Sequence, residues 1–319
     1  MSDIVHVAVA VIMNERNEVC ISLRDKDAHQ GGLWEFPGGK LEQGETVEQA
    51  LIREVKEELT LVIEQSRPVI TITHDYPDKT VCLYVRKTLS YQGQAVGVEG
   101  QQVKWVPVSQ LSDYDFPAAN LSIIKVLQLP DKYLITGKWL DNDDFINKLK
   151  KALNHDIKLV QLRLKNDSKK DMSQMQSLFE NVAILCKQAN TKLMLNAADN
   201  YLDIIDLTNI DFEGFHADSR TLMSLSRRPK GRLFSASCHS EEELVKAAQL
   251  QADFVVLSPV QKTASHPEMP AMGWQQFAAM LEHIAIPVYA LGGLTEKDMK
   301  VARQHGAQGI AAISAFWND

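Results

Sequence analysis

Eight short apolar segments alternate with amphipathic segments through the second half of the chain, and this alternation narrows the choice of folds more than any other feature. The apolar segments begin with YLIT at Tyr133 and end with QGIAAI at Ile313. Segments such as DDFINKLKKAL and EEELVKAAQL, which have the period of an amphipathic helix, lie between most of them. Strands that alternate with helices form a parallel sheet, and eight such strands in roughly 190 residues predict a compact (β/α)8 TIM barrel.

The first half of the chain, up to about Leu129, follows a different pattern. Short β-branched runs separated by turn residues predict five strands: HVAVAVIM, VCISLR, VITITH, TVCLYVRKTL and QVKWVPV. One helix is predicted over residues 47–59, because Thr46 and Gln49 have capping-box spacing and apolar residues recur four apart at Leu51, Val55 and Leu59. We therefore expect an α/β domain with a mixed sheet. The proline in LQLPDKY ends the preceding helix and places the domain boundary, giving domains at residues 1–130 and 131–319.

The composition restricts the class of protein. Hydrophobic residues make up 45% and charged residues 24% of the 319 residues, a mixture typical of soluble globular proteins. The net charge of −7 argues against a nucleic-acid polymer as a partner but leaves open a single nucleotide carried with a metal ion. The four cysteines form no CxxC pair, and no apolar run reaches the roughly 18 residues of a membrane span. The start lacks a basic segment, so we expect a cytoplasmic protein with no membrane partner.

Three glutamates crowd one face of the helix predicted over residues 47–59. At 100° per residue, Glu57 lies about 60° from Glu54 on one side, and Glu58 lies about 40° from it on the other. Two such charges about 4 Å apart repel by roughly 4 kcal/mol at an effective dielectric near 20. A divalent cation between them would replace this repulsion by attraction. Oxygen ligands of this kind favour Mg²⁺ or Mn²⁺ over zinc. The alternative is a solvated acidic face paired with Arg and Lys, the commoner fate of such a run.

The residues around this face favour the metal. They have the spacing G-x5-E-x7-R-E-V-x-E-E, whose fixed positions are Gly39, Glu45, Arg53, Glu54, Glu57 and Glu58. The pattern resembles the Nudix box, a loop–helix–loop that binds metal-bound nucleoside diphosphates and hydrolyses them. The resemblance implies a Nudix α/β/α sandwich with a mixed sheet, and hydrolysis of a phosphoanhydride by metal-activated water. Thr60 stands where the family usually has glycine, a departure that affects the helix exit more than the metal site.

The same resemblance implies a catalytic set and a metal site. Its metal ligands would be the Gly38 carbonyl and a group of carboxylates: Glu54, Glu57, Glu58 and Glu99. Glu99 lies in a loop where close relatives supply a further acidic group, although a lone loop glutamate is more often simply solvated. Arg53 would orient a glutamate by an ion pair, and Glu57 at i+4 is the expected partner. Mg²⁺ is the implied cofactor, with Mn²⁺ as a substitute.

Three further stretches resemble the MutT-type branch of the family, the diphosphatases that remove oxidised guanine nucleotides before DNA replication can incorporate them. The stretches are SLRDKDAHQGGLWEFPGGK, DYPDKTVCLY and YDFPAAN, so the resemblance covers nearly all of residues 4–129. It implies a substrate-binding set: Arg24, His29, Glu35, Phe36, Pro37, Gly38 and Asn120. It also implies a reaction that converts 8-oxo-dGTP to 8-oxo-dGMP and pyrophosphate.

The residues themselves leave alternatives open. The Asn120 amide carries both a donor and an acceptor, which suits a purine edge, but Asn120 also fits the N-cap of a helix over LSIIKVL. Phe36 fits a base contact and fits ordinary core packing equally well. Lys79 falls where relatives carry a basic residue, and we interpret it as a solvated lysine in a hairpin.

The barrel pattern over residues 133–316 resembles the thiamine phosphate synthase and TenI-like family. Chemistry in such barrels lies at the carboxyl ends of the strands. The residues there form a predicted phosphate or ligand site: Arg163, Lys165, Asn196, His216, His239, Gly292, Gly293 and Ser314. The glycines and Ser314 match the usual phosphate-binding corner, although the two glycines also fit a simple tight turn.

Two departures from the synthases argue against synthase activity. The synthases hold Mg²⁺ with an acidic residue after the asparagine, but Asn196 is followed by Ala197 and Ala198, and Thr221 stands at the second acidic position. The TenI-like branch does without this metal and uses a histidine that His239 matches. A hydrogen-bonded histidine at a strand end is the alternative for His239.

These observations support three hypotheses. The first is a diphosphatase for oxidised guanine nucleotides. The second is a Nudix pyrophosphohydrolase that acts on thiamine diphosphate or a related compound in thiamine metabolism. In the third, the barrel binds a thiamine or thiazole phosphate and has no catalytic activity.

Overall fold

The computed structural model describes residues 4–27, 30–164, 172–197, 202, 205–263, 270–282 and 284–317. The chain divides into two compact units, formed mainly by the residues up to Leu129 and by the residues from Pro130 onward. Three residues named above, His29, Lys165 and Ala198, lie outside the described residues.

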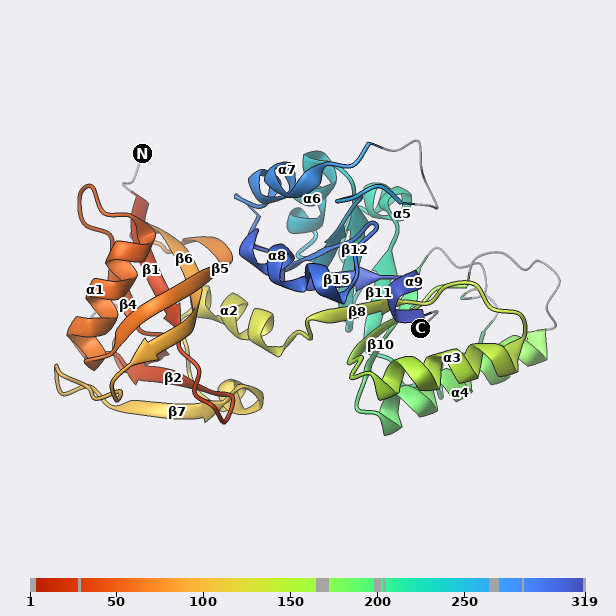
Figure 1. The fold of residues 1–319 in the computed structure, drawn as a ribbon, viewed down its shortest axis with the longest axis horizontal. Helices are drawn as coiled ribbons and strands as arrows, with labels where there is room; N and C mark the ends of the chain where they lie inside the picture. Colours follow the sequence, from red (N-terminus) through yellow and green to blue (C-terminus); the bar gives the residue numbers. More distant parts are fainter. Residues whose placement is uncertain are drawn as a thin grey trace. The chain divides into compact units, whose positions relative to one another are not determined.

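The first unit is built on two sheets (Figure 1). The larger sheet has the order β4 (Gly38–Lys40), β1 (Ile4–Val11), β6 (Thr80–Gln92) and β5 (Val62–Asp75). Strands β1 and β6 run parallel and the other pairs antiparallel, so the sheet is mixed, as predicted. The smaller, antiparallel sheet has the order β3 (Trp34–Glu35), β2 (Glu18–Leu23) and β7 (Val103–Pro107). Three helical segments complete the unit: α1 (Val47–Leu59), η1 (Val108–Asp113) and α2 (Ala118–Gln128).

Alternate residues of β1 contribute to two separate cores, because successive strand side chains point to opposite faces of a sheet. Val9 and Val11 pack with Ile123 of α2 and its neighbours. Ala8 and Ala10 pack with the buried stripe of α1, which consists of Ala50, Leu51, Val55 and Leu59. A helix therefore covers each face of the sheet, which is the predicted α/β/α sandwich.

Helix α1 begins and ends as local interactions require. The Thr46 hydroxyl accepts a hydrogen bond from the Gln49 backbone N–H, and the Gln49 side chain accepts one from the Thr46 N–H, which confirms the capping box. At the other end, Thr60 adopts a left-handed conformation with φ of 61°. Glycine is the usual residue in that conformation. The end of α1 therefore has the usual backbone geometry, although threonine adopts it less readily than glycine.

The second unit is a closed barrel of eight parallel strands, as predicted. In chain order its strands are β8 (Lys132–Ile135), β9 (Leu159–Leu162), β10 (Lys192–Asn196), β11 (Gly214–Ala217), β12 (Leu233–Cys238), β13 (Phe254–Leu257), β14 (Val288–Ala290) and β15 (Gly309–Ala312). The described helical segments are α3 (Asn142–Asn154), α4 (Met172–Gln188), α5 (Ser219–Ser224), α6 (Glu241–Gln249), α7 (Gly273–Leu281), η3 (Glu296–Asp298), α8 (Met299–Gln304) and α9 (Ser314–Trp317).

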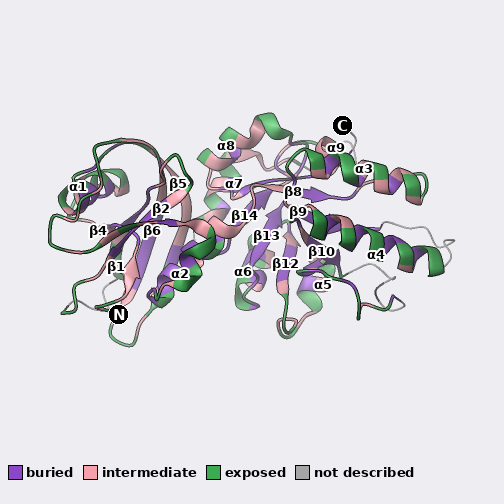
Figure 2. Ribbon diagram, turned by 90° about the horizontal axis from the view of Figure 1, so that it is seen from below, coloured by how far each residue is buried: buried purple, intermediate pink, exposed green. Residues whose placement is uncertain are grey.

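The barrel strands are buried along almost their whole length (Figure 2). Inside the barrel, the rings of Tyr133, Phe254 and Tyr289 contact one another with centroids 5.4–5.6 Å apart. Outside it, the apolar stripes of α3 and α4 pack against β8, β9 and β10. Within the described residues, no helix has both the length and the apolar character needed to cross a membrane.

Candidate active site

A cavity of about 280 Å³ lies in the first unit, where the end of α1 approaches β1 and β4. The side chains of Val5, Val7 and Val9 form its apolar floor with Val81 and Leu83. Six of the predicted substrate and metal residues line it: Arg24, Glu35, Phe36, Gly38, Glu58 and Asn120. Residues far apart in the sequence therefore meet at one site, since Val5 and Asn120 line the same cavity.

Glu58 reaches this cavity from the last turn of α1. Its Oε2 accepts a hydrogen bond from the Gly38 backbone N–H at 3.1 Å. Burial first, and then the neighbouring carboxylates of Glu35, Glu54 and Glu99, together raise the pKa of Glu58 to about 8, against the lowering effect of the Gly38 hydrogen bond. The acidic side chains are therefore close enough to repel one another.

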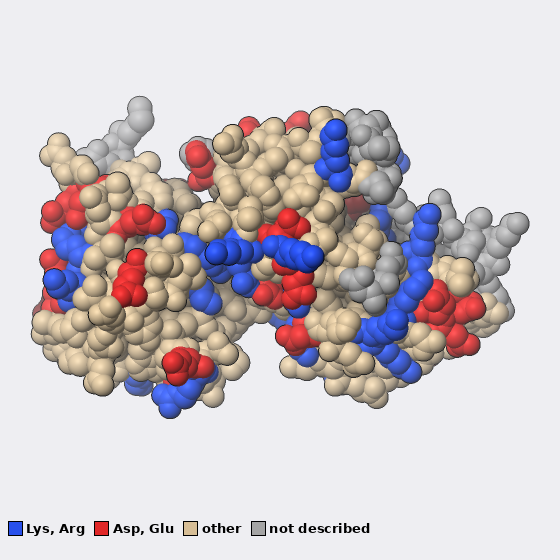
Figure 3. Space-filling view, viewed as in Figure 1, with Lys and Arg blue, Asp and Glu red and all other residues tan. Residues whose placement is uncertain are grey.

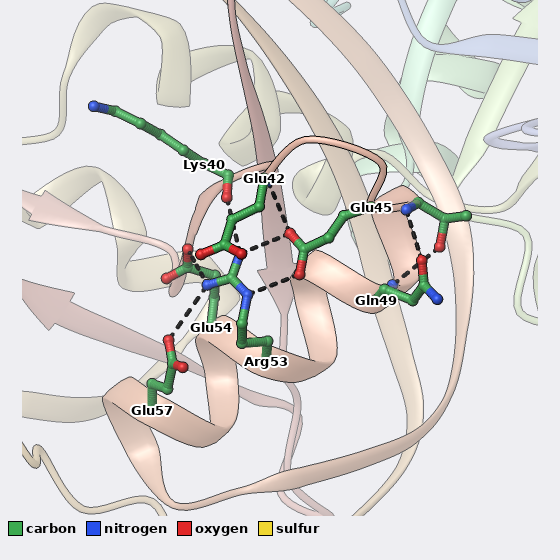
Figure 4. Close-up of polar contacts among 8 residues, drawn as sticks. Lys40, Glu42, Glu45, Gln49, Arg53, Glu54 and Glu57 are labelled. Carbon is green, nitrogen blue, oxygen red and sulfur yellow. Dashed lines mark hydrogen bonds and ion pairs between the residues drawn. The ribbon is translucent and has the colours of Figure 1, made fainter.

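Arg53 organises the rest of the acidic face (Figure 4). Its guanidinium binds both oxygens of Glu45 at 2.8 Å, one oxygen of Glu54 at 2.8 Å, and one oxygen of Glu57 at 3.3 Å. It also donates to the backbone carbonyl of Lys40 at 3.1 Å. The expected partner Glu57 is thus present at i+4, but the closest, bidentate partner is Glu45. Sequence reasoning placed Glu45 in the motif without a role, and its fixed spacing from Arg53 was the available signal.

Two glycines of β4 allow close approaches beside the cavity. A Cβ on Gly39 would lie 2.2–2.4 Å from the Glu54 carboxylate, and a Cβ on Gly38 would lie 2.1 Å from the Ala8 carbonyl oxygen. Gly38 also has φ of 144°. The two glycines let β4 approach β1 and the acidic helix closely, and both of them line the cavity.

The carboxylates at this site are of the chemical type that binds a divalent cation. Carboxylate oxygens are the ligands that Mg²⁺ prefers. The pKa of Glu58 is raised mainly by burial and also by the nearby carboxylates, and a bound cation would favour the charged form of Glu58. Within the described ranges, however, no three His, Cys, Asp or Glu side chains are already gathered as a metal site. Glu54 is paired with Arg53, the Glu57 side chain is 59% exposed, and Glu99 is exposed with its N–H bonded to the Gln101 side chain.

The predicted substrate residues have clear neighbours. Arg24 forms an ion pair with Glu35, whose own pKa is raised because burial outweighs the effect of Arg24. Phe36 lines the cavity and also stacks on Phe116 at 5.5 Å, so its core packing is confirmed and its contact with a base stays a prediction. The Pro37 carbonyl accepts a hydrogen bond from the Ala10 N–H and fixes the loop to β1.

Asn120 and Lys79 correct two interpretations. The N-cap of α2 is Pro117, and Asn120 lies in the first turn, so the N-cap interpretation of Asn120 was wrong. Its side chain is buried and lines the cavity. Lys79 does lie in the turn between β5 and β6, but it also lines the cavity with Tyr76, which its interpretation as a solvated lysine did not anticipate.

The described barrel residues lie at the carboxyl ends of their strands, as expected. Arg163 follows β9, Asn196 ends β10, and His239 follows β12. His239 Nδ1 lies 2.8 Å from the Ser258 carbonyl oxygen, and its backbone N–H donates to Glu243, which matches the interpretation as a hydrogen-bonded strand-end histidine. His216 is buried between the hydroxyls of Ser235 and Ser237, each at 2.8 Å.

The glycine corner forms a tight turn. A Cβ on Gly292 would meet Pro259 at 2.8 Å, and one on Gly293 would meet the Lys262 carbonyl oxygen at 2.5 Å. Both glycines have positive φ, of 112° and 66°. Ser314 begins the four-residue helix α9 beyond β15.

A mixed-sheet unit with an acidic helix at a cavity, followed along the chain by a closed parallel barrel, defines this chain as an α/β protein of two compact units. The NUDIX domain model matches residues 8–126, and the thiamine monophosphate synthase model matches residues 132–316. The chain belongs to both families: it is a Nudix hydrolase fused to a thiamine monophosphate synthase/TenI barrel.

Curated relatives match each half separately. The 8-oxo-dGTP diphosphatase of Escherichia coli (strain K12) is 38% identical over 122 residues, which cover 38% of this chain and 95% of that protein. A protein of Aquifex aeolicus (strain VF5), named provisionally as thiamine-phosphate synthase 2, is 33% identical over 192 residues, which cover 60% of this chain and 99% of that protein.

Solved structures match in the same way. A structure of MutT from a study of Aliivibrio salmonicida and Vibrio cholerae is 33% identical and covers 39% of this chain and 97% of its own, with a TM-score of 0.35. Thiamine phosphate pyrophosphorylase from Pyrococcus furiosus is 20% identical and covers 58% of this chain and 86% of its own, with a TM-score of 0.46.

Proposed function

We propose that the first unit, over residues 1–130, is a Mg²⁺-dependent diphosphatase that hydrolyses 8-oxo-dGTP to 8-oxo-dGMP and pyrophosphate. The observation that carries this proposal is the cavity that Asn120, Phe36 and Arg24 share with Glu58 of the acidic helix. A base-reading amide, an aromatic ring and a guanidinium therefore lie beside the carboxylates that the chemistry needs. The relatedness of this unit to the 8-oxo-dGTP diphosphatase of Escherichia coli supports the same substrate.

Each residue has a role in this mechanism. The Asn120 amide pairs with the purine edge, Phe36 packs against the base, and Arg24 binds a phosphate or the base. Arg53 holds Glu54 and Glu57 on the face of α1 that leads to the cavity, and the Gly38 N–H holds Glu58. Water attacks a phosphorus, the anhydride bond to the leaving pyrophosphate breaks, and a carboxylate accepts the proton of the water.

The carboxylates Glu54, Glu57 and Glu58, with Glu99 and the Gly38 carbonyl, are the proposed ligands of the cation. Bound Mg²⁺ would supply activation of the water and neutralisation of the leaving group. Mn²⁺ would serve in its place because it accepts the same oxygen donors.

Steady-state kinetics of the intact chain with 8-oxo-dGTP and dGTP test the proposal. We expect kcat/KM for 8-oxo-dGTP to exceed that for dGTP by a large factor in the presence of Mg²⁺. Glu57→Gln should abolish hydrolysis while leaving the melting temperature close to that of the wild type. Equal turnover of the two nucleotides, or none of either, would refute the assignment.

The barrel supports a second candidate function in thiamine metabolism, since the thiamine monophosphate synthase model matches it. In this alternative the first unit hydrolyses thiamine diphosphate or a related pyrophosphate. A thiamine diphosphate assay with Mg²⁺, run beside the nucleotide assay, decides between the two, because absence of thiamine monophosphate as a product removes this candidate.

We further propose that the barrel, over residues 131–319, binds a thiamine or thiazole phosphate. Gln161 of β9 supports a ligand there. Its side chain is buried, and its Nε2 has no hydrogen-bond partner among the described residues, so this donor is available to a bound ligand. Calorimetry of the wild type and His239→Ala with thiamine monophosphate and thiazole phosphate would measure binding apart from turnover. No heat of binding to either protein would rule out the ligand site.

A further inference from the structure

A cluster of one lysine and two aromatic rings lies on the smaller sheet of the first unit and spans its central strand. Lys104 Nζ lies 4.7 Å from the centroid of the Trp34 ring and 5.2 Å from that of Tyr114. The two rings meet edge to face, with centroids 5.4 Å apart and planes at 83°. An ammonium at these distances is attracted by the negative faces of both rings.

Strand pairing holds the cluster in place. Lys104 of β7 is paired with Ile21 of β2, and Leu23 of the same strand is paired with Trp34 of β3, so the lysine reaches across β2 to the indole ring. Lys104 is exposed, whereas Trp34 and Tyr114 are half-buried against the core that contains Ile21. Among the described residues no carboxylate is paired with Lys104, so the two rings are the recorded partners of its charge.

Each ring lies in a segment that leads to the cavity, although neither ring is among the residues that line it. Trp34 immediately precedes Glu35 and Phe36, and Tyr114 begins the segment that leads to Pro117 and Asn120. The backbone links these two segments, because the Trp34 N–H donates to the Asp115 carbonyl oxygen at 2.8 Å. Nearer the cavity, Phe36 stacks on Phe116 at 5.5 Å.

We propose that Lys104 is a positioning residue for recognition of the nucleotide base. By holding Trp34 against Tyr114 it fixes the spacing between Phe36 and Asn120, and so sets how strongly the cavity discriminates between 8-oxo-dGTP and dGTP. This inference depends on the function proposed above. Lys104 does not touch the reacting phosphates in this scheme, so it acts on base recognition and not on the chemical step.

Kinetics of Lys104→Met and Lys104→Arg in the full chain test the inference. Methionine keeps the apolar length of the side chain but removes its charge, so we expect KM for 8-oxo-dGTP to rise by about threefold or more, as for loss of a cation–π contact. The preference for 8-oxo-dGTP over dGTP should fall by a similar factor, while kcat stays within about twofold of the wild type. Arginine keeps a cation over the rings and should restore both KM and the preference.

Lys56→Met is the matched control, since Lys56 is an exposed lysine of the same unit with no ring contact recorded among the described residues. It should leave the nucleotide preference unchanged. The inference is overturned if Lys104→Met keeps the wild-type KM and preference, or if Lys104→Arg is impaired as much as Lys104→Met. If the wild type itself does not distinguish 8-oxo-dGTP from dGTP, the proposed function fails instead. Affinity for 8-oxo-dGMP, measured by calorimetry, should fall with Lys104→Met and provides a readout that does not require turnover.

Discussion

At the scale of single residues, the acidic face of α1 is organised by a cation of the protein. Arg53 contacts Glu45, Glu54 and Glu57 together, and its side chain is only 24% exposed. The Arg53–Glu45 contact is a bidentate pair, the strongest geometry that a guanidinium and a carboxylate can form. On the face that Figure 3 shows, acidic and basic side chains lie beside one another at the end of the first unit that contains α1.

Addition of a single methyl group at Gly39 should lower the activity of the enzyme. In Gly39→Ala the new Cβ would lie within 2.4 Å of the Glu54 carboxylate, so Glu54 must move away from Arg53 and the cavity. We expect kcat to fall by about a hundredfold, the typical effect of a misplaced catalytic group. Gly44→Ala is the control, because no atom lies within 4 Å of a Cβ added there. Wild-type kcat in Gly39→Ala would show that Glu54 does not need its present position.

His216 should make the stability of the barrel depend on pH. Burial lowers the pKa of His216 to about 3, and the nearby charge of Arg163 contributes. His216 is therefore protonated below about pH 6.5 in the unfolded chain but stays neutral in the folded barrel. The free energy of unfolding must fall as the pH is lowered from 6.5 toward 3, by at most about 1.4 kcal/mol per pH unit.

Unfolding of wild type and His216→Asn between pH 7 and pH 4 measures this effect. Asparagine keeps a donor and an acceptor for Ser235 and Ser237 but does not titrate in this range. The wild type should lose more stability on acidification than the variant does. Parallel curves for the two proteins would contradict the explanation.

At the scale of elements, α1 is fixed by its ends as much as by its apolar stripe. The capping box satisfies backbone donors at the first turn, directly after Glu45, the partner of Arg53. At the last turn Thr60 holds the left-handed conformation, with its N–H bonded to the Lys56 carbonyl and its hydroxyl donating to the Gln94 carbonyl. These two hydrogen bonds offset the roughly 1 kcal/mol that a left-handed conformation costs a residue other than glycine.

Removal of the N-cap should destabilise the first unit. We expect Thr46→Ala to lower the free energy of unfolding by about 1 kcal/mol, because a helix donor loses its partner. Thr46→Ser retains the hydroxyl and should change it by much less. Urea denaturation of both variants, followed by circular dichroism, measures the difference. Equal effects of alanine and serine would mean that the hydroxyl contributes nothing to the cap.

At the scale of the whole molecule, the chain contains separate hydrophobic cores. The cores of the first unit involve the two faces of its mixed sheet, whereas the largest described core of the barrel lies between its strands and α3 and α4. The cavity is lined entirely by residues of the first unit. Ligands of the two units should therefore stabilise different cores.

Scanning calorimetry of the intact chain should show this separation. We expect two unfolding transitions. Mg²⁺ with a non-hydrolysable 8-oxo-dGTP analogue should raise the midpoint temperature of only one of them. A ligand at 100 times its dissociation constant stabilises the native state by about 2.7 kcal/mol. Glu57→Gln, which lacks one proposed metal ligand, should show a smaller shift. A single transition that moves as a whole would contradict independent unfolding of the two units.

The sequence by itself determined the fold class, the bounds of α1 and the identity of several residues that line the cavity. Local patterns suffice for these features: the period of apolar residues selects helix or strand, and the motif fixes residues that lie within two helical turns and one loop of each other. Tertiary structure alone decided which partners those residues have. Glu45 became the main partner of Arg53, Pro117 rather than Asn120 became the N-cap, and Lys79 came to line the cavity. Apart from the fixed spacing of Glu45 and Arg53, such contacts depend on strand register and on how closely loops approach a sheet, and the sequence contains no local signal for either.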